Sequence, residues 1–347
     1  MDVFNGHEIC RKYIPPYTKE ARQSAGNRTR KTSVAYAPLF KEHADTEQLA
    51  YNLGVFRPGD EIEITLKMHG TSQRTGRVPV LKGYVKSFWD KVLRRPGNPA
   101  YYYDIVSGTR RVVLTDYGGG YYGSNAFRRQ HHEFFEGKLW KGEEVYYEVV
   151  GYTDDGQPIM PSVDNKKIKD KDFVKQYGKT TTFSYGCDCA QQAWKEDRGQ
   201  DSNKPISDIY VYRMTMTNED GNIVEYTPDF MRYRCEQMGV KCVPVMWKGV
   251  IPYAPERIIG EDADGNSVLT EPCSAGEWVK DIAEWFYDGA DPIGKTHIRE
   301  GVVVRILNRP KFTAFKHKNF MFKVLSGIAV EQAEENITSD EDRLAEM

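Results

Sequence analysis

A lysine at the end of an alternating stretch is the first residue whose surroundings suggest chemistry. Residues 61–67 (EIEITLK) alternate acidic and apolar side chains, the pattern of a half-buried strand, and Gly70 permits a sharp turn after them. At such a strand end Lys67 can point into a cleft, where a neutral amine acts as a nucleophile. The ordinary alternative is a lysine whose ammonium group lies in solvent. These residues alone favour the ordinary alternative, so the rest of the chain must decide.

Charged residues in or beside apolar, strand-like stretches supply what an activated lysine needs. They stand later in the chain, at Arg110, Glu148, Glu300, Lys316 and Lys318. The last two are two residues apart and therefore share one face of a strand. Cations close to a lysine favour its neutral form. Taken singly, each of these residues is explained as well by a salt bridge or a solvated side chain.

In their order along the chain, these residues resemble the motifs of the covalent nucleotidyltransferases, which comprise the polynucleotide ligases and the mRNA capping enzymes. Residues 67–70 (KMHG) match the nucleophile motif K-x-[DH]-G. The further matches are Glu148 in the third motif, residues 300–303 (EGVV) in the fourth, and Lys316 with Lys318 in the fifth. Each motif is short, but their joint order is specific.

The histidine form of the first motif, followed by Thr71 and Ser72, is more similar to RNA ligases than to DNA ligases. The stretch 208–212 (DIYVY), a hairpin signal at 218–222 and a helix after Thr227 resemble the RNA ligase 2-like branch, which includes phage enzymes. The resemblance spans roughly residues 61–323.

This resemblance implies an ATP-dependent RNA ligase that uses Mg²⁺, with Mn²⁺ as an alternative. Lys67 is expected to attack the α-phosphate of ATP and form a lysyl-AMP intermediate. The AMP then passes to an RNA 5′-phosphate, and a 3′-hydroxyl displaces it. His69 is expected to act mainly after the enzyme has been adenylylated. The implied nucleotide contacts are Leu66, Lys67, Arg110 (phosphate or ribose), Glu148 (ribose), Tyr212 (adenine), Glu300 (metal ion or lysine orientation), and Lys316 and Lys318 (phosphates).

Two residues depart from the family pattern. Arg213 stands where an acid is usual, and Tyr147 replaces a usual glycine before Glu148. Spacing does not separate Arg110 from Arg111, although the sequence SGTR favours Arg110. A capping-type guanylyltransferase and a catalytically inactive nucleic-acid-binding protein stay as alternatives. The form of the RNA (nicked duplex, single strand or broken tRNA loop) and the oligomeric state stay open.

Composition limits the class of protein. The 347 residues carry a net charge of −2, so no general basic field indicates a nucleic-acid coat protein. The six cysteines form no zinc-binding pattern, and no phosphate-binding loop motif G-x-x-x-x-G-K-[ST] is present. The glycine-rich residues 118–123 lack the parallel βαβ surroundings of a dinucleotide site. No apolar run is long enough to span a membrane, which predicts a cytoplasmic protein.

The predicted elements indicate an α+β protein. The resemblance implies an adenylyltransferase core of two mainly antiparallel sheets flanked by helices, with the nucleotide cleft between them. We expect an N-terminal extension at 1–60, the nucleotidyltransferase domain at 61–326 and an acidic tail at 327–347. The lysine-rich residues 165–179 predict a solvated loop or helix, with a nucleic-acid contact as the alternative. Further strands are predicted at 101–106, 111–115, 144–150, 208–217, 222–226, 240–245, 301–307 and 312–316, and helices at 227–239 and 274–287.

Overall fold

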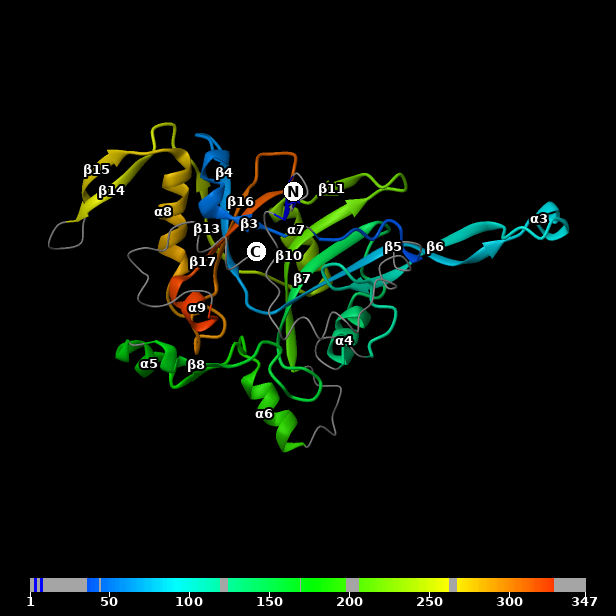
Figure 1. Ribbon diagram of the computed structural model, residues 1–347, viewed down its shortest axis with the longest axis horizontal. Helices are drawn as coiled ribbons and strands as arrows, with labels where there is room; N and C mark the ends of the chain where they lie inside the picture. The colour runs from blue at the N-terminus through cyan, green and yellow to red at the C-terminus, as the bar shows by residue number, and fades with distance from the viewer. Residues whose placement is uncertain are drawn as a thin grey trace.

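The computed structural model describes residues 3–4, 7–8, 36–43, 45–118, 124–168, 170–197, 206–261 and 267–327 (Figure 1). Most of the glycine-rich stretch 118–123 and the acidic tail therefore lie outside the described residues. The fold is α+β, as predicted, and its body contains two mainly antiparallel sheets. Within the described residues, no helix is long and apolar enough to cross a membrane.

The first sheet carries the lysine-bearing strand near its centre. Its strand order is β13 (Val245–Val250), β4 (Glu61–Lys67), β16 (Gly301–Ile306), β17 (Thr313–Lys318) and β3 (Glu47–Gln48). Every neighbouring pair is antiparallel except β17 with β3. The alternation of β4 places Ile62 and Ile64 in a core beneath helix α8 (Ala275–Tyr287), while Glu63 and Lys67 point to the opposite face.

The second sheet follows directly after the lysine. Its order is β11 (Ile223–Glu225), β10 (Ser207–Thr217), β7 (Glu143–Gly151), β5 (Thr71–Val85) and β6 (Asn98–Gly108), with β12 (Lys241–Cys242) parallel beside β10. Helices α4 (Ala126–Phe134) and α7 (Pro228–Met238) bury apolar side chains against one face of this sheet. The distal parts of β5 and β6 leave the body as a long arm, capped by helix α3 (Phe88–Val92) (Figure 1).

Smaller elements complete the described chain. They are the strand pairs β1 (Val3–Phe4) with β2 (His7–Glu8), β8 (Val163–Asp164) with β9 (Thr180–Thr181), and β14 (Glu256–Glu261) with β15 (Ser267–Pro272), the 3-10 turns η1 (Leu49–Tyr51), η2 (Leu53–Val55) and η3 (Asn165–Lys167), and the helices α5 (Lys171–Tyr177), α6 (Asp188–Glu196) and α9 (Phe320–Leu325). Helix α5 lies in the lysine-rich stretch and buries Phe173 and Tyr177, so this segment contributes to the core.

Local capping explains why α7 begins and ends as predicted. The Thr227 hydroxyl accepts a hydrogen bond from the Phe230 backbone N–H, and Pro228 occupies the first turn. Gly239 ends the helix in the left-handed conformation (φ +70°).

Two predicted strands are wrong. Residues 111–115 form no named strand. A tight turn spans residues 109–112, in which the Thr109 N–H donates to the Val112 carbonyl, and beyond it Val113 makes an isolated bridge to Gly108. Residues 240–245 belong to β12 in one sheet and to the start of β13 in the other. Pro244 stands between these strands and has no backbone N–H to continue a ladder.

The described part of the segment before Glu61 packs into the body. Leu49 and Phe56 are buried in the core under α8, and Ala37 and Phe40 are buried beside β5 and β6. This segment also supplies strand β3. Residues 36–43 and 45–60 are therefore integrated with both sheets, in contrast to the peripheral extension expected there.

Candidate active site

Three neighbouring strands bring the motif residues side by side. In the register of β4, β16 and β17, Gly301 lies opposite both Lys67 and Lys318. Glu300 directly precedes Gly301, and its Oε1 lies 2.6 Å from the Lys67 Nζ and 3.8 Å from the Lys318 Nζ. One carboxylate thus faces two lysines that are more than 200 residues apart in the chain.

Two glycines allow this close packing. A Cβ on Gly70 would lie 2.4 Å from the Val149 carbonyl oxygen, and one on Gly301 would lie 2.1 Å from the His317 carbonyl oxygen. Gly301 also has φ +146°, a backbone conformation that residues other than glycine rarely adopt. The turn at Gly70 carries the chain from the first sheet to the second. Because Gly70 packs closely against β7, this contact fixes the position of the strand end that carries Lys67.

The charge on Glu300 is stabilised by its neighbours. Only 4% of its side chain is exposed, and burial by itself would raise its pKa. The cations of Lys67 and Lys318, together with His69, outweigh burial and hold the pKa of Glu300 well below its usual range. Glu300 is therefore an ionised carboxylate within a cationic cluster.

His69 approaches Glu300 from outside the main pocket. Its Nδ1 lies 3.6 Å from the Glu300 Oε2, and its ring packs edge-on against Phe183 and Phe322. The backbone N–H of His69 donates to the Tyr185 hydroxyl at 2.5 Å. The two aromatic rings and this hydrogen bond fix the turn after the lysine.

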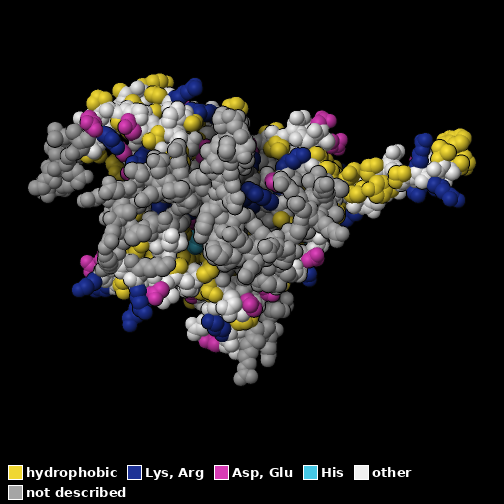
Figure 2. Space-filling view, in the orientation of Figure 1, with side chains coloured by type: hydrophobic (Ala, Val, Ile, Leu, Met, Phe, Trp, Pro, Cys, Tyr) yellow, Lys and Arg dark blue, Asp and Glu magenta, His cyan; other side chains and the backbone are white. Residues whose placement is uncertain are grey.

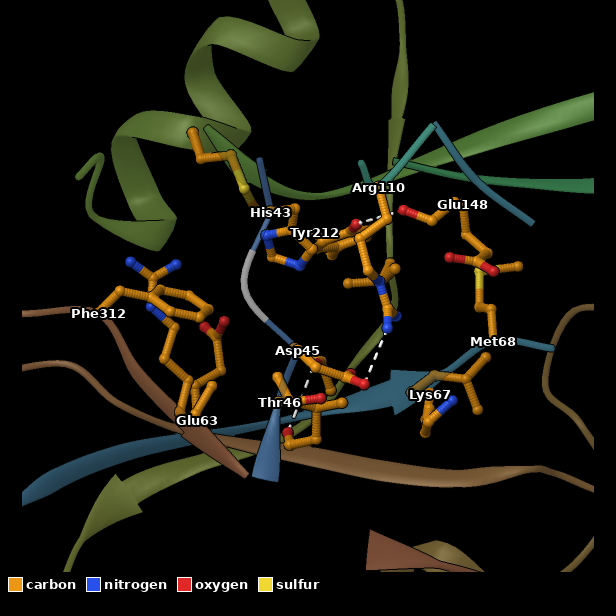
Figure 3. Close-up of a pocket in the computed structure, with 18 of the residues that line it drawn as sticks. His43, Asp45, Thr46, Glu63, Lys67, Met68, Arg110, Glu148, Tyr212 and Phe312 are labelled. Carbon is orange, nitrogen blue, oxygen red and sulfur yellow. Dashed lines mark hydrogen bonds and ion pairs between the residues drawn. The ribbon is translucent and has the colours of Figure 1, made fainter. Parts of the chain in front are cut away.

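A pocket between the two sheets collects five of the implied nucleotide contacts (Figure 3). They are Leu66, Lys67, Arg110, Glu148 and Tyr212. The remaining three, Glu300, Lys316 and Lys318, adjoin this pocket through their ion pairs and do not form its wall. Arg111 is exposed and lies outside the pocket lining, so the geometry separates the two arginines in favour of Arg110.

Glu148 and Tyr212 stand on the far wall of this pocket, on neighbouring strands. Glu148 lies opposite Ser72 on β5, and Tyr212 occupies an irregularity of β10 that turns it out of the ladder. The Tyr212 and Ser72 hydroxyls share a 3.1 Å hydrogen bond. Burial raises the pKa of Glu148 to about 7, which the charge of Lys67 partly opposes.

Acidic Asp45 links two cations of the pocket and was not anticipated from the sequence. Its Oδ2 lies 2.8 Å from the Arg110 Nη1, and its Oδ1 lies 3.9 Å from the Lys316 Nζ. Asp45 comes from the segment before β3, as does His43, whose ring faces Tyr212 at 5.5 Å between centroids. Burial, reinforced by Arg213 and Arg110, lowers the pKa of His43 to about 3, so its ring is neutral. The short segment around these residues has no periodic pattern that could have indicated a site.

Arg128 on α4 holds the start of β5 and was also missed. Its guanidinium is buried and donates to the Ser72 carbonyl at 3.2 Å and to the Thr71 hydroxyl at 2.6 Å. A buried arginine in the first turn of an amphipathic helix has no distinguishing signal in the sequence. It acts on the site by positioning the residues that follow the Lys67 turn.

The two departures from the family pattern have structural partners. Arg213 forms an ion pair with Glu225 on β11 and a 3.0 Å hydrogen bond with the His43 Nδ1. Tyr147 is fully buried under the second sheet, where its hydroxyl bonds to the Thr75 hydroxyl at 2.8 Å. Tyr147 is thus part of the core, whereas Arg213 contacts His43 and Phe312, two residues that line the pocket.

Solved structures resemble this chain, whereas no family model and no curated protein sequence matches it. A Naegleria gruberi RNA ligase variant with AMP and Mn has 13% identity and a TM-score of 0.40, and the same ligase with PPi has 13% identity and a TM-score of 0.39. The similarity covers 81% and 82% of this chain, but 56% and 57% of those chains. The chain therefore spans little more than half the length of the structures it matches.

Proposed function

We propose that this chain is an ATP-dependent RNA ligase that acts through a lysyl-AMP intermediate on Lys67. One observation carries the proposal. The Lys67 amine lies against Glu300 and in register with Lys318, at the wall of a pocket that Arg110 and Glu148 also line. These residues match the family motifs in type and order, and they come from both sheets. Their position in or directly beside one pocket supports nucleotidyl transfer there.

In the proposed first step, the Lys67 Nζ attacks the α-phosphorus of ATP in line. An N–P bond forms, the bond to the β-phosphate oxygen breaks, and pyrophosphate leaves while the nitrogen loses a proton. Glu300 is a weak base because its pKa is low, so its task is to orient Nζ. The Lys318 Nζ lies 3.8 Å from the same carboxylate, so the negative charge of Glu300 stays paired once Lys67 is neutral.

The other side of the pocket suits the nucleoside. Tyr212 offers an aromatic ring for adenine, and Glu148 offers carboxylate oxygens for the ribose hydroxyls. Arg110 and Lys316 are then the phosphate contacts, once a nucleotide displaces their ion pairs with Asp45. Transfer of AMP to an RNA 5′-phosphate and attack by a 3′-hydroxyl complete the reaction. A cytoplasmic location is part of the same proposal.

A divalent metal ion fits this site together with bound phosphates. Among the described residues, no group of three or more His, Cys, Asp or Glu side chains could hold a metal ion. Within the described residues, the buried Glu300 Oε2 accepts no hydrogen bond, and the His69 Nδ1 lies 3.6 Å from it. This carboxylate oxygen can therefore serve as a metal ligand. Mg²⁺ commonly uses one or two carboxylates plus substrate phosphates. We therefore assign Glu300 as its protein ligand, and the ion, when bound, neutralises phosphate charge.

Transfer of label from ATP to the protein tests the proposal. After incubation with α-labelled ATP and Mg²⁺, the denatured wild-type chain should carry covalent label that is stable in alkali and released by acid, as a phosphoramidate is, and Lys67→Ala should carry none. Lys195→Ala, on an exposed lysine of α6 that does not line the pocket, is the matched control and should label fully. Labelling of Lys67→Ala at the wild-type level would refute the proposal.

Two rivals give other results in the same assay. Preferential labelling by GTP would select a capping-type guanylyltransferase on the same scaffold. RNA binding without any protein labelling would select an inactive binding protein. A panel of 5′-phosphorylated RNAs, including a nicked duplex, a single strand and a broken tRNA loop, then identifies the substrate of an active enzyme.

A further inference from the structure

The arm formed by β5 and β6 ends in an exposed aromatic and basic tip. Strand β5 has 15 residues, which at about 3.3 Å per residue corresponds to a length of about 50 Å. Residues at its base belong to the core, but beyond Val80 the paired strands enter no hydrophobic cluster of the described residues. Isolated two-stranded ribbons are marginally stable in water. A ribbon of this length therefore calls for a function at its end.

The tip, defined here as residues 84–97, exposes large apolar side chains. Phe88 is 72% exposed and Trp89 is 67% exposed, and their rings meet edge-on at 5.6 Å between centroids. Tyr84 and Leu93 are exposed beside them. Figure 2 shows hydrophobic side chains gathered at the end of the arm, with lysine and arginine side chains around them. Such a concentration on a projecting element is a mark of an interaction surface.

The tip carries an excess of positive charge. Its four cations are Lys86, Lys91, Arg94 and Arg95, and its one acid is Asp90. All four cations are exposed, and none forms an ion pair with another described residue. Asp90 is already engaged by Ser87 in the capping box that starts α3. An unpaired cationic tip on a chain of net charge −2 favours a polyanionic partner.

The base of the arm leads to the candidate active site. Strand β5 starts beside Ser72, which lines the pocket, and β6 ends two residues before Arg110, which also lines it. An extended polyanion bound at the tip could therefore follow the arm toward the Lys67 pocket. Exposed aromatic rings among cations are the combination that binds single-stranded nucleic acid, because bases stack on the rings while phosphates meet the charges.

We infer that the tip of the arm binds single-stranded RNA, with Phe88 and Trp89 as the stacking platform and Lys86, Lys91 and Arg95 as the phosphate contacts. The choice of RNA as the polyanion rests on the proposed function, whereas the stacking and charge arguments do not. The inference adds a binding surface remote from the nucleotide pocket.

Fluorescence anisotropy of a labelled, 5′-phosphorylated single-stranded RNA, without ATP, tests the inference on the full chain. Phe88→Ser/Trp89→Ser should raise Kd by about 5- to 150-fold for each stacked base lost. Lys91→Ala/Arg95→Ala should lower the slope of log Kd against log salt by about 1.4, at about 0.7 for each lost phosphate contact on a single strand. Trp285→Ser, at a tryptophan that is 62% exposed on α8, is the matched control and should leave Kd unchanged.

Equal RNA affinity of the wild-type chain and both tip variants would overturn the inference. So would tip-dependent self-association, measured by sedimentation, or tip-dependent binding to anionic lipid vesicles, if RNA affinity stayed unchanged. A tip-dependent affinity for DNA with none for RNA would also overturn it. The proposed labelling of Lys67 does not involve the arm, so the two proposals can fail separately. If the wild-type chain is not labelled by ATP but binds RNA through the tip, the proposed function is refuted and this inference stands.

Discussion

The Lys67–Glu300 pair allows a quantitative test by Glu300→Gln. This substitution keeps the size of the side chain and removes the charge that faces two lysines at 2.6 and 3.8 Å. A hydrogen bond to a charged group contributes about 1.5–3 kcal/mol, and breaking a buried ion pair costs about 3–5 kcal/mol. Because 21% of the Lys67 side chain is exposed, water can partly solvate the lysine charge that the substitution leaves unpaired. We therefore expect a loss of about 2–4 kcal/mol in the free energy of unfolding.

A double-mutant cycle isolates the pair from other effects. Lys67→Met removes the other charge, and the double variant contains neither. If the pair is formed, the double variant should lose less free energy of unfolding than the two single variants lose together, by about 1–3 kcal/mol. Urea unfolding followed by circular dichroism measures all four proteins at neutral pH. Glu219→Gln, at an exposed hairpin turn, is the control and should be near neutral.

The pH dependence gives the sign of the same interaction. The pKa of Glu300 is lowered by folding, so its stabilisation is fully present above its unfolded pKa of about 4.3 and is lost as the pH falls toward the lowered value. The gap in stability between wild type and Glu300→Gln should therefore narrow below about pH 4.3. A cycle that is additive within about 0.5 kcal/mol, or a gap that does not narrow, would refute the ion pair as described.

Two further outcomes follow from the site. Gly301→Ala should abolish labelling by ATP and lower the urea midpoint, because the added Cβ would lie 2.1 Å from the His317 carbonyl oxygen. Gly54→Ala is the control and should do neither, since nothing lies within 4 Å of its added Cβ. Equal effects of the two substitutions would contradict the packing argument. Burial raises the pKa of Glu148 to about 7, so its contribution should destabilise the folded state increasingly as the pH rises from about 4.3 to about 7. Thermal unfolding should show that Glu148→Gln gains stability over wild type across this range, and a constant difference between the two would count against it.

The local patterns of the sequence determined many of the elements that carry the site. The alternation of residues 61–67, the apolar run that follows Glu300 and the run that ends at Lys318 are strands in the structure. Helix α7 has the predicted cap and end, because Thr227 and Gly239 act on their own neighbours. Such features depend on residues close in the chain, so a single sequence contains the information for them.

Long-range packing produced what the sequence did not reveal. Strand β5 includes Gly76, Pro79 and Gly83, which are unfavourable in an isolated strand, yet pairing with β6 and β7 keeps it extended. Asp45 and Arg128 acquire their roles from partners on distant segments, Arg110 and Ser72. Neither residue stands in a recognisable pattern.

Lys67 illustrates the division between the two kinds of information. Its place at a strand end and the motif around it were readable from the residues alone. Its contact with Glu300, 233 positions away, depends on the antiparallel register of β4 and β16 and on the absence of a side chain at Gly301. The sequence by itself determined which residues could do the chemistry. Only the tertiary structure decided their mutual distances, because the register of distant strands is set by burial of their apolar faces and by backbone hydrogen bonds.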